Sequence, residues 1–534
     1  MPKYIVVTGG VLSGLGKGIV TASIGVLLKA RGFKVSPIKC DGYLNYDAGT
    51  LRPTEHGEVW VTKDGGEIDQ DLGHYERFLD IDVPKLNNIT SGQIYWQVVK
   101  NEREGKYLGK TVQLIPHVTD EIKRRFRLAA KNSDFALIEI GGTVGDYENA
   151  IFIEAARQLR QEGESVIYVH VSYVPIPKHL GEAKTKPTQL SVKTLLSMGI
   201  QPDFIVARCE KPLDSVRKKK IAMFCNVPIE HVISDPNVEI TYEVPLIFEE
   251  QGFGDLILKK FGMQKRKARL EKWRRYIERI KSLRDEVKIG IVGKYFKTGE
   301  YKLTDSYISV IEAVKHASWK LGVKPRILFI SSDDVERKVS VLDLVDGIIV
   351  PGGFGKSGVA GKIKAIRYAR EHNKPYLGLC FGMQLAVVEF ARHVCKLHRA
   401  HSTEIMPGTP HPVIDLLPWQ KELLKQNKYG ATMRLGEHKV KIKPRTLARK
   451  LYKKRFVYRR FRHRYEVNPR YVKTLEKAGV VFSGTTPSED IMQIMELPSN
   501  DFFFATQYHP EFSSRFFKPE EAFVGFVKAC VEGR

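Results

Sequence analysis

Residues 3–20 read KYIVVTGGVLSGLGKGIV, and this stretch decides the fold that we expect for the first half of the chain. An apolar run at 5–7 leads into a glycine-rich turn, and a helical pattern follows over 19–31. A buried strand, a tight turn and a helix make up the repeating unit of parallel α/β sheets. Glycines let backbone N–H groups approach a phosphate closely, and Lys17 adds a positive charge where the helix begins. The stretch therefore predicts a nucleotide-binding strand–loop–helix unit.

The turn departs from the common phosphate-binding loop in two places. The spacing from Gly10 to Gly16 is one residue longer than usual, and Gly18 stands where Ser or Thr usually follows the lysine. A glycine-rich turn that holds no ligand is the alternative interpretation. The strand before the turn and the helix after it favour nucleotide binding.

The alternation of strand and helix continues along the chain and predicts two α/β domains. Further buried strands are expected at 35–38, 136–139, 166–169 and 204–207, and a second series at 287–292, 327–330, 347–350 and 375–379. Between the two series, residues 263–286 are highly charged and place Leu270, Trp273, Ile277, Ile280 and Leu283 at helical spacing. We expect a first domain over 1–262, a linker helix over 263–286 and a second domain over 287–534.

The composition is that of a folded protein rather than a disordered one. Hydrophobic residues make up 43% of the 534 residues and charged residues 28%. The six cysteines are scattered without a Cys-x-x-Cys pair, which excludes a disulfide scaffold and a zinc ribbon. No signal peptide is recognisable, and no apolar run reaches the roughly 18–20 residues of a membrane span. We expect a soluble, cytoplasmic protein that has no membrane partner.

A formal net charge of +25 indicates anionic partners of some kind. The most basic stretch, 438–464, contains no acidic residue. An RNA- or DNA-binding patch is one interpretation, and a solvated face on a protein that handles phosphates is the other. We favour the second because no nucleic-acid-binding motif accompanies the charge.

Two acidic segments could supply a metal site in the first domain. Residues 67–76, EIDQDLGHYE, are rich in carboxylates, and Glu139 lies at the end of a predicted strand. Carboxylates at the carboxyl ends of parallel strands point into the crevice where such sheets bind ligands. Mg²⁺ prefers one or two carboxylates together with phosphate oxygens and water. Residues 184–189, KTKPTQ, place cations and hydroxyls together and suit a second anionic group, although an ordinary loop has the same pattern.

The second domain contains a candidate nucleophile. Cys380 lies in the pattern Gly-Leu-Cys-Phe-Gly, after an apolar strand and before a predicted helix over 383–392, which is the form of a nucleophile turn. A strand near the C-terminus would place His509 and Glu511 on one face, so that Glu511 holds the imidazole as it acts on the thiol. Residues 351–355, PGGFG, could supply backbone N–H groups for an oxyanion. An inert buried cysteine with an unrelated histidine is the alternative.

Taken together, these residues resemble the CTP synthase family over 3–530. The most specific motifs are DLGHYERF at 71–78, EIGGTVGD at 139–146, KTKPT at 184–188 and RHRYEVN at 462–468. The second half alone resembles a Cys-His-Glu glutaminase, and the first half narrows the choice. The resemblance implies an N-terminal, P-loop-like parallel-sheet amidoligase domain and a C-terminal α/β class I glutamine amidotransferase domain.

The implied activity is ATP-dependent amination of UTP to CTP in pyrimidine nucleotide biosynthesis. ATP would phosphorylate O4 of the uracil ring, and ammonia would displace the phosphate. Asp71 and Glu139 would hold Mg²⁺, with Lys17 and Lys39 beside the transferring phosphate. The resemblance assigns ATP binding to Gly14, Leu15, Gly16, Lys17, Gly18, Ile19, Asp71, Pro236, Asn237 and Val238. It assigns UTP and the inhibitory product CTP to Ser13, Asp146, Tyr147, Glu148, Lys184, Thr185, Lys186, Pro187, Thr188, Gln189 and Lys220, the last from a neighbouring subunit.

For the second domain, the resemblance implies that Cys380 attacks glutamine with His509 as base and Glu511 as orienting group. Glutamine would be held by Gly353, Phe381, Gly382, Met383, Gln384, Glu404 and Arg464. Ammonia would reach the first domain through a tunnel gated near Pro53, His56 and Val59. The family pattern also implies GTP as an activator and a homotetramer, with filaments as a further form of assembly.

Some positions differ from the family pattern, chiefly in regulatory segments. Ser357 and Ala360 stand where Arg and Glu are usual after the PGGFG motif, which bears on activation by GTP, and residues 146–151 differ in the segment expected to contact CTP. Two alternatives are a different amidotransferase with the same domains and a regulatory relative that binds nucleotides, or RNA through 438–464, without turnover. The intact Lys17, Asp71 and Cys380 favour an active CTP synthase.

Overall fold

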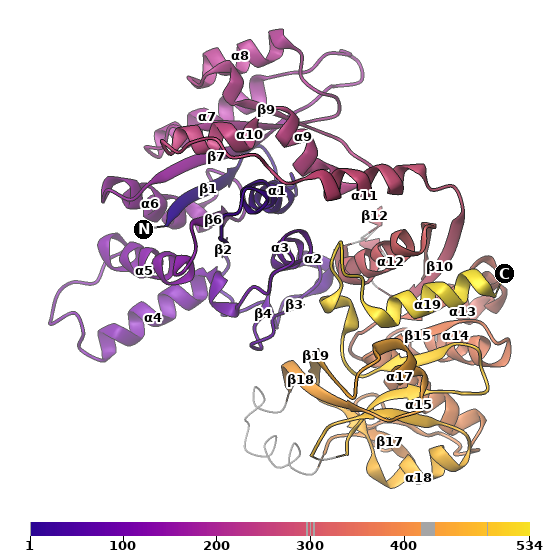
Figure 1. The fold of residues 1–534 in the computed structure, drawn as a ribbon. Coiled ribbons are helices and arrows are strands. Elements are labelled where there is room, and N and C mark those ends of the chain that lie inside the picture. Colours follow the sequence, from indigo (N-terminus) through magenta and orange to yellow (C-terminus); the bar gives the residue numbers. More distant parts are fainter. Residues whose placement is uncertain are drawn as a thin grey trace. The chain divides into compact units, whose positions relative to one another are not determined.

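The computed structural model describes residues 2–294, 297–298, 301–302, 305–417, 433–488 and 490–533, without the side chains of residues 53–54, 297–298 and 301–302. The chain forms two compact units (Figure 1). Met1–Thr50 and Glu67–Arg279 form the first unit, and Leu51–Gly66 and Ile280–Arg534 form the second. A short segment from the first half of the sequence therefore folds with the second unit.

The first unit is built on a seven-stranded, wholly parallel sheet with the strand order β5-β2-β6-β1-β7-β8-β9. Its strands are β1 Lys3–Gly9, β2 Val35–Asp41, β5 Asn88–Thr90, β6 Phe135–Ile140, β7 Val166–Val174, β8 Phe204–Cys209 and β9 Val232–Pro236. The central strand β1 pairs on both sides, with Ile5 opposite Leu137 and Ile167. Because all the strands run in one direction, their carboxyl ends meet along one edge, where ligands bind in such sheets.

Helices cover both faces of this sheet. They are α1 Lys17–Ala30, α3 Asp71–Leu79, α4 Ser91–Arg103, α5 Thr119–Ala130, α6 Tyr147–Gln161, α7 Lys186–Ser197, α8 Ser215–Cys225, α9 Val244–Glu250 and α10 Phe253–Lys260. Tyr4 and Val6 pack with apolar residues of α4, α5 and α6 on one face, while α1 lies on the other and packs on α3 and α9 (Figure 1). Burial on both faces explains why the strands are almost continuously apolar.

The second unit contains a nine-stranded mixed sheet with the strand order β13-β10-β14-β15-β23-β22-β21-β18-β19. The first five strands in that order are parallel, and the other pairings are antiparallel. The strands are β10 Glu286–Gly293, β13 Lys324–Ser331, β14 Gly347–Val350, β15 Tyr376–Leu379, β18 Arg434–Ile442, β19 Phe456–His463, β21 Val481–Thr485, β22 Met492–Glu496 and β23 Phe503–Thr506.

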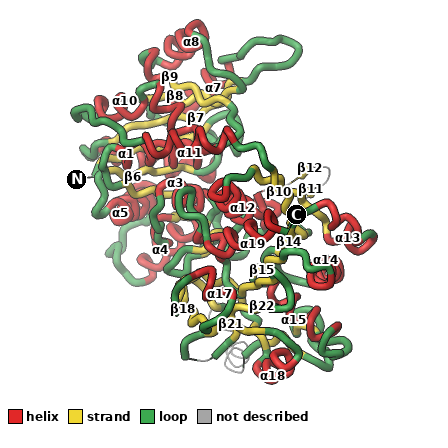
Figure 2. The backbone as a smooth tube through the Cα atoms, turned by 45° about the vertical axis from the view of Figure 1, so that its right-hand side comes forward, coloured by secondary structure: helices red, strands yellow, loops and turns green. Residues whose placement is uncertain are grey.

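Two apolar clusters lie on the two faces of the mixed sheet. One includes α12 Ile308–Leu321 and α19 Glu521–Glu532, and the other includes α14 Val359–Glu371, α15 Phe381–His393 and α18 Pro469–Lys477. Figure 2 shows the strands of each unit as layers flanked by helices. The sheet of the second unit thus positions the start of α15, which follows Cys380 directly.

The structure confirms every strand of the two series predicted for the two domains, with longer bounds in most cases. The predicted helix over 263–286 is wrong in length, because the helix α11 spans only Glu271–Ser282. Its apolar stripe is buried as predicted at Leu270, Trp273, Ile277 and Ile280, and Trp273 Nε1 donates to the Tyr242 carbonyl at 2.7 Å. Among the described helices, none has the length and apolar character needed to cross a membrane.

Candidate active sites

The glycine-rich loop joins β1 to α1 at the carboxyl edge of the first sheet. Gly14 and Gly16 have φ of 73° and 88°, in the left-handed region that favours glycine, and Gly16 caps α1. Lys17 begins the helix, is 7% exposed, and donates from Nζ to the Gly142 carbonyl at 2.7 Å. The loop therefore presents backbone N–H groups and a buried ammonium group at the same edge.

Lys39 is the centre of a buried group of carboxylates beside this loop. Its Nζ contacts Asp71, and it lies 3.4 Å from Glu139 Oε1, 3.6 Å from Asp69 Oδ1 and 3.7 Å from Asp41 Oδ1. Lys39 and Asp41 come from β2, Glu139 comes from β6, Asp71 begins α3, and Asp69 lies just before α3. One lysine thus gathers carboxylates from three elements that are distant in sequence.

The pKa values of two carboxylates in this group are shifted in opposite directions. Burial alone raises the pKa of Asp71, but the Lys39 ammonium outweighs it and lowers that pKa well below its usual range. Burial raises the pKa of Glu139 to about 7, against the opposing charge of Lys39. The Tyr75 hydroxyl donates to Glu139 and fixes its orientation. Asp71 and Glu139 both lie next to Lys39, so two carboxylates are close together. This pair fits Mg²⁺, which prefers one or two carboxylates together with phosphate oxygens.

A second cationic pocket lies in the same unit. A pocket of about 400 Å³ is lined by Lys184, Thr185, Lys186, Gln189 and Lys220, along with Glu182, Ala183, Val216, Arg217 and Phe224. Glu182 forms ion pairs with Lys184 and Arg217. One chain therefore brings Lys220 together with the 184–189 loop, whereas the resemblance implies that this lysine comes from a neighbouring subunit. The pocket suits an anionic group of nucleotide size.

The structure does not bring every residue assigned to UTP or ATP into these two places. Thr188 is buried and donates to the Tyr173 carbonyl at 3.1 Å, and Pro187 lies in the first turn of α7. Asp146 accepts from the Thr143 N–H at 2.6 Å, and the neighbouring Tyr147 is 95% exposed. Ser13 and Glu148 are exposed, and none of these six residues lines the Lys220 pocket. Leu15, Gly18 and Ile19 lie with Lys17 at the loop, and Pro236, Asn237 and Val238 lie at the end of β9.

Cys380 lies in the second unit at the sharp turn between β15 and α15. It caps α15 with φ 49° and ψ −99°, a backbone conformation that a non-glycine residue adopts only at a cost. The turn is tight, because a Cβ on Gly382 would lie 2.1 Å from the Val350 carbonyl oxygen. Gln507 Nε2 lies 3.6 Å from the Cys380 sulfur. This is the strained strand-to-helix turn that the Gly-x-Cys-x-Gly pattern predicts, and the Cys380 side chain at its tip is buried.

His509 and Glu511 form a hydrogen-bonded pair, but not on a strand. The Nδ1–H of His509 donates to Glu511 Oε1 at 2.7 Å. The predicted strand is wrong here: β23 ends at Thr506, and Pro510–Ser513 form a 3₁₀ turn that folds Glu511 back onto the ring. Burial lowers the pKa of His509, but the charge of Glu511 and the interaction with the Cys380 sulfur outweigh it and raise the pKa to about 10.

Cys380 lines two adjoining cavities. The first, of about 120 Å³, also contains Gly353, His509 and Glu511, together with Glu58 and Val59 from the 51–66 segment. The second is smaller and is lined by Gly353, Gln384, Glu404 and Arg464, which were assigned to glutamine. The other residues with that assignment, Phe381, Gly382 and Met383, are the first residues of α15 and are buried. Of the proposed tunnel gate, Val59 lines the first cavity, His56 is exposed, and the Pro53 side chain lies outside the described residues.

Comparison with known proteins decides the family. A family model described as "CTP synthase N-terminus" matches residues 3–263, and one described as "Glutamine amidotransferase class-I" matches residues 302–529. CTP synthase from Pyrococcus abyssi is 56% identical over 536 residues, which cover 100% of this chain and 98% of that protein. The Sulfurisphaera tokodaii CTP synthase is 53% identical over 537 residues and covers 99% of both chains. The chain belongs to the CTP synthase family.

These matches confirm the family that the sequence motifs predicted. They also confirm the prediction of an N-terminal and a C-terminal α/β domain. Among solved structures, the "Trypanosoma brucei CTPS - glutaminase domain with bound acivicin" is 36% identical. It covers 46% of this chain and 94% of its own, with a TM-score of 0.43.

Two buried cationic or polar side chains near the sites of this CTP synthase were not found from the sequence. His170 forms two hydrogen bonds of 2.9 Å, from Nδ1 to Thr8 Oγ1 and from Nε2 to Ser191 Oγ. Burial lowers its pKa to about 3, so the ring is neutral and donates one of these bonds while it accepts the other. Lys362 is 3% exposed, and burial lowers its pKa to about 8. A Cβ on Gly353 would lie 3.6 Å from Lys362 Nζ, so this side chain lies next to the 351–355 segment. A lone His in an apolar strand and a Lys in a helix carry no sequence signal.

Gly18 explains one departure of this CTP synthase from the common phosphate-binding loop. A Cβ at this position would lie 2.7 Å from Asp71 Oδ1. We expect Gly18→Ala to displace Asp71 and to lower the rate of CTP formation by about 10²-fold, since small misplacements of reacting groups have effects of that size. The measurement is the rate of CTP formation with ammonia as nitrogen source.

The matched control is Gly408→Ala, because a Cβ there meets no atom within 4 Å. We expect this variant to keep the wild-type rate. An unchanged rate in Gly18→Ala would show that the reaction tolerates displacement of the Asp71 carboxylate. It would contradict the explanation that glycine is needed at position 18 to leave room for Asp71.

The pair formed by His509 and Glu511 predicts a pH-dependent stability. The folded pKa of about 10 lies above the unfolded value of about 6.5, so the protonated ring stabilises the fold fully below pH 6.5 and loses this contribution as the pH rises through 10. Glu511→Gln removes the charge that raises the pKa. We therefore expect the free energy of unfolding to fall less between pH 6.5 and 10 in Glu511→Gln than in the wild type.

Urea unfolding at several pH values measures this difference. Glu532→Gln is the matched control, because the Glu532 side chain is 65% exposed and pairs only with Lys528, at 3.5 Å, among the described residues. Parallel pH profiles for the wild type and Glu511→Gln would contradict the assignment of the raised pKa to Glu511.

Proposed function

We propose that the residues described above divide the reaction between the two units. The overall reaction is that of the CTP synthase family: ATP-dependent amination of UTP to CTP with ammonia released from glutamine. The first unit would carry out phosphorylation and amination, and the second would hydrolyse glutamine. The observation that carries this division is that Cys380, His509 and Glu511 line one cavity, whereas Lys17, Lys39 and Asp71 gather at the edge of the other sheet.

In the first unit, Lys17 and the N–H groups of the glycine-rich loop bind the phosphates of ATP. Lys39 holds Asp71 and Glu139 in place, and these two carboxylates are the ligands for Mg²⁺. When bound, Mg²⁺ neutralises charge on the phosphate oxygens. The γ-phosphoryl group moves from ATP to O4 of the uracil ring. Ammonia then bonds to C4 of the ring as the C4–O4 bond breaks and phosphate leaves.

The Lys220 pocket binds the phosphates of UTP in this proposal. Lys184, Lys186 and Lys220 supply three ammonium groups around one cavity, and Thr185 and Gln189 supply neutral hydrogen-bonding groups. Phosphate binding by several lysines gives affinity that falls with rising ionic strength. Product CTP carries the same phosphates and would compete for the same pocket.

In the second unit, His509 accepts the thiol proton of Cys380, and its raised pKa favours the resulting imidazolium beside a thiolate. The sulfur attacks the amide carbon of glutamine, and the backbone N–H of Gly353 donates a hydrogen bond to the amide oxygen as it becomes negative. His509 then gives its proton to the departing nitrogen, which leaves as ammonia. Water hydrolyses the thioester and releases glutamate. Glu404 and Arg464, on the other side of Cys380, carry the charges that match the ammonium and carboxylate groups of the substrate.

We further propose, from the family pattern, that GTP activates the enzyme, that the chain assembles as a homotetramer with filaments as a higher form, and that it acts in the cytoplasm. No nucleic-acid partner is proposed.

CTP formation from UTP, ATP, Mg²⁺ and glutamine, followed by absorbance with and without GTP, tests these proposals. CTP formed faster with GTP supports the activator. CTP formed equally fast without GTP would support the proposed reaction and contradict activation by GTP. The absence of CTP with both glutamine and ammonia would contradict the proposed division of the reaction.

A further inference from the structure

A strongly basic pocket lies in the second unit, where α14 and α15 end. Its volume is about 430 Å³, and seven of its eight lining residues are basic. The permanent cations are Arg367 and Arg370 from α14, Arg392 from α15, and Lys396 and Arg399 from the loop that follows. None of these residues lines either cavity that contains Cys380, so the pocket is separate from the glutamine site.

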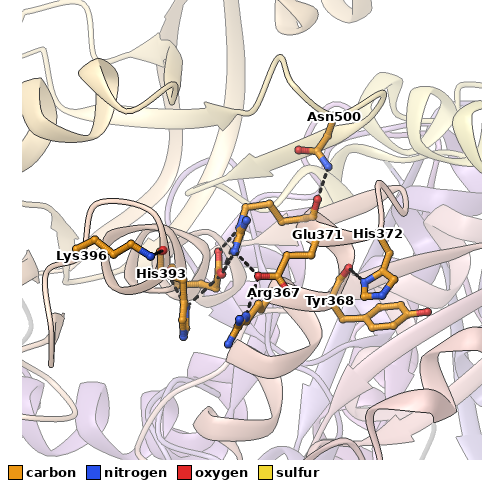
Figure 3. Close-up of polar contacts among 9 residues, drawn as sticks. Arg367, Tyr368, Glu371, His372, His393, Lys396 and Asn500 are labelled. Carbon is orange, nitrogen blue, oxygen red and sulfur yellow. Dashed lines mark hydrogen bonds and ion pairs between the residues drawn. The ribbon is translucent and has the colours of Figure 1, made fainter.

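Within the part of the chain that the structure describes, carboxylates pair with only two of these five cations. Glu371 accepts from Arg367 Nε at 2.9 Å and from Arg370 Nη2 at 3.2 Å (Figure 3). Glu389, which is fully buried, accepts from Arg370 Nη2 at 2.8 Å and lies 3.2 Å from His393 Nδ1. These bonds hold the guanidinium groups of α14 in fixed positions on one side of the pocket.

The other three cations have no carboxylate within ion-pair distance among the described residues. Arg392 Nε donates to the Ala400 carbonyl at 2.6 Å, and Lys396 Nζ donates to the His393 carbonyl at 2.9 Å. Burial lowers the pKa of Arg392, and no carboxylate opposes this effect. Three positive charges are therefore gathered in one cavity without compensation from the protein's own acids.

The loop that carries Lys396 and Arg399 is held in an unfavourable backbone conformation. Their φ angles are 58° and 65°, in the left-handed region where residues with side chains are uncommon. The Thr409 hydroxyl donates to the Arg399 carbonyl at 2.8 Å and ties the loop to the segment after it. The fold thus maintains a loop geometry that keeps both cations at the pocket.

The dipoles of the neighbouring helices offset part of the positive charge of the pocket but not all of it. Two helices end at the pocket, and each carboxyl end carries about half a negative charge, which favours nearby cations. Together they offset about one of the three uncompensated cations. A net positive pocket remains, and such a pocket is a binding site for anions.

We propose that this pocket binds a small, multiply charged phosphate compound of the size of a di- or triphosphate. Arginine guanidinium groups match phosphate oxygens with paired hydrogen bonds, and Lys396 adds a point charge. Apart from histidines, the lining residues include no aromatic side chain on which a base could stack. The phosphates, rather than a base, are therefore the part of the ligand that the pocket recognises.

The test is a calorimetric titration of the full-length protein with inorganic triphosphate. Wild type is compared with Lys396→Gln/Arg399→Gln, which removes two exposed cations, and with Lys439→Gln/Lys441→Gln, which removes the same charge from the exposed face of β18. Nucleotide sites in the first unit are common to all three proteins. We expect the pocket variant to lose one site per chain or to bind it about tenfold more weakly, the effect of losing charge-assisted hydrogen bonds. The β18 variant should bind as the wild type does.

Superimposable isotherms for the wild type and the pocket variant would overturn the proposal, as would an equal loss in the β18 variant. If the double variant unfolds at a lower temperature, the single variants Lys396→Gln and Arg399→Gln are titrated, and each is expected to weaken the same site. A second titration with ATP separates the sources of the phosphate. Tighter binding of ATP than of triphosphate at the variant-sensitive site indicates a nucleotide, and equal or weaker binding indicates a free polyphosphate.

Discussion

Cys380→Ala is expected to abolish CTP formation from glutamine while CTP formation from ammonia continues. The variant removes the sulfur that attacks the amide, and loss of a triad nucleophile lowers the rate by a factor on the order of 10⁶. Ammonia added directly needs no glutaminase, so the carboxylate group around Lys39 and the Lys220 pocket should still produce CTP. The measurement is the ratio of the two rates in one preparation.

Cys395→Ala is the matched control, because Cys395 is a free cysteine that lines neither cavity containing Cys380. It should keep both rates. Loss of the ammonia-dependent rate in a folded Cys380→Ala protein would contradict the division of the reaction between the two units.

Asp71→Asn is expected to stop CTP formation with either nitrogen source. The substitution removes one of the two carboxylates proposed to hold Mg²⁺ and the closest contact of Lys39. Since electrostatic stabilisation of the transferring phosphate is the main contribution to such reactions, we expect a decrease on the order of 10³-fold. Release of glutamate by Cys380 provides the internal comparison, because the triad itself is unchanged.

Asp120→Asn serves as its control, since the Asp120 side chain is 59% exposed on α5 and pairs with Lys123. Both CTP rates should remain at the wild-type level in this variant. A normal rate in Asp71→Asn would contradict the assignment of Asp71 as a ligand of Mg²⁺. If a higher Mg²⁺ concentration restores the rate of this variant, the assignment is supported.

The sequence predicts those features that depend on short segments. The glycine-rich loop and the Cys380 turn each combine an apolar strand, small residues and a helix start within a few positions, so their local geometry is encoded where they occur. The buried strands of both sheets are found for the same reason, because uninterrupted apolar runs between turns have few other interpretations.

Features that arise from packing could not be predicted in this way. Lys39 lies inside an apolar strand, and only the register of β2 beside β6 places it next to Glu139. The pairing of His509 with Glu511 was predicted, but a strand was expected where a 3₁₀ turn makes the contact. The antiparallel strands β18 and β19 were not predicted, since half-buried strands with charged outer faces give a weaker pattern than fully buried ones.

The 51–66 segment has a consequence for any attempt to study the two activities on separate polypeptides. The chain passes between the units at 50–51, at 66–67 and at 279–280, so the unit that holds Cys380 is discontinuous in sequence. Trp60 is fully buried with its ring 4.9 Å from that of Phe512, and Arg460 donates to the Val61 carbonyl at 2.9 Å. A fragment that starts at residue 287 would therefore expose the apolar surface under Trp60 and remove the Val61 carbonyl that accepts from the buried Arg460. The 51–66 segment thus supplies part of the packed interior of the unit that holds Cys380.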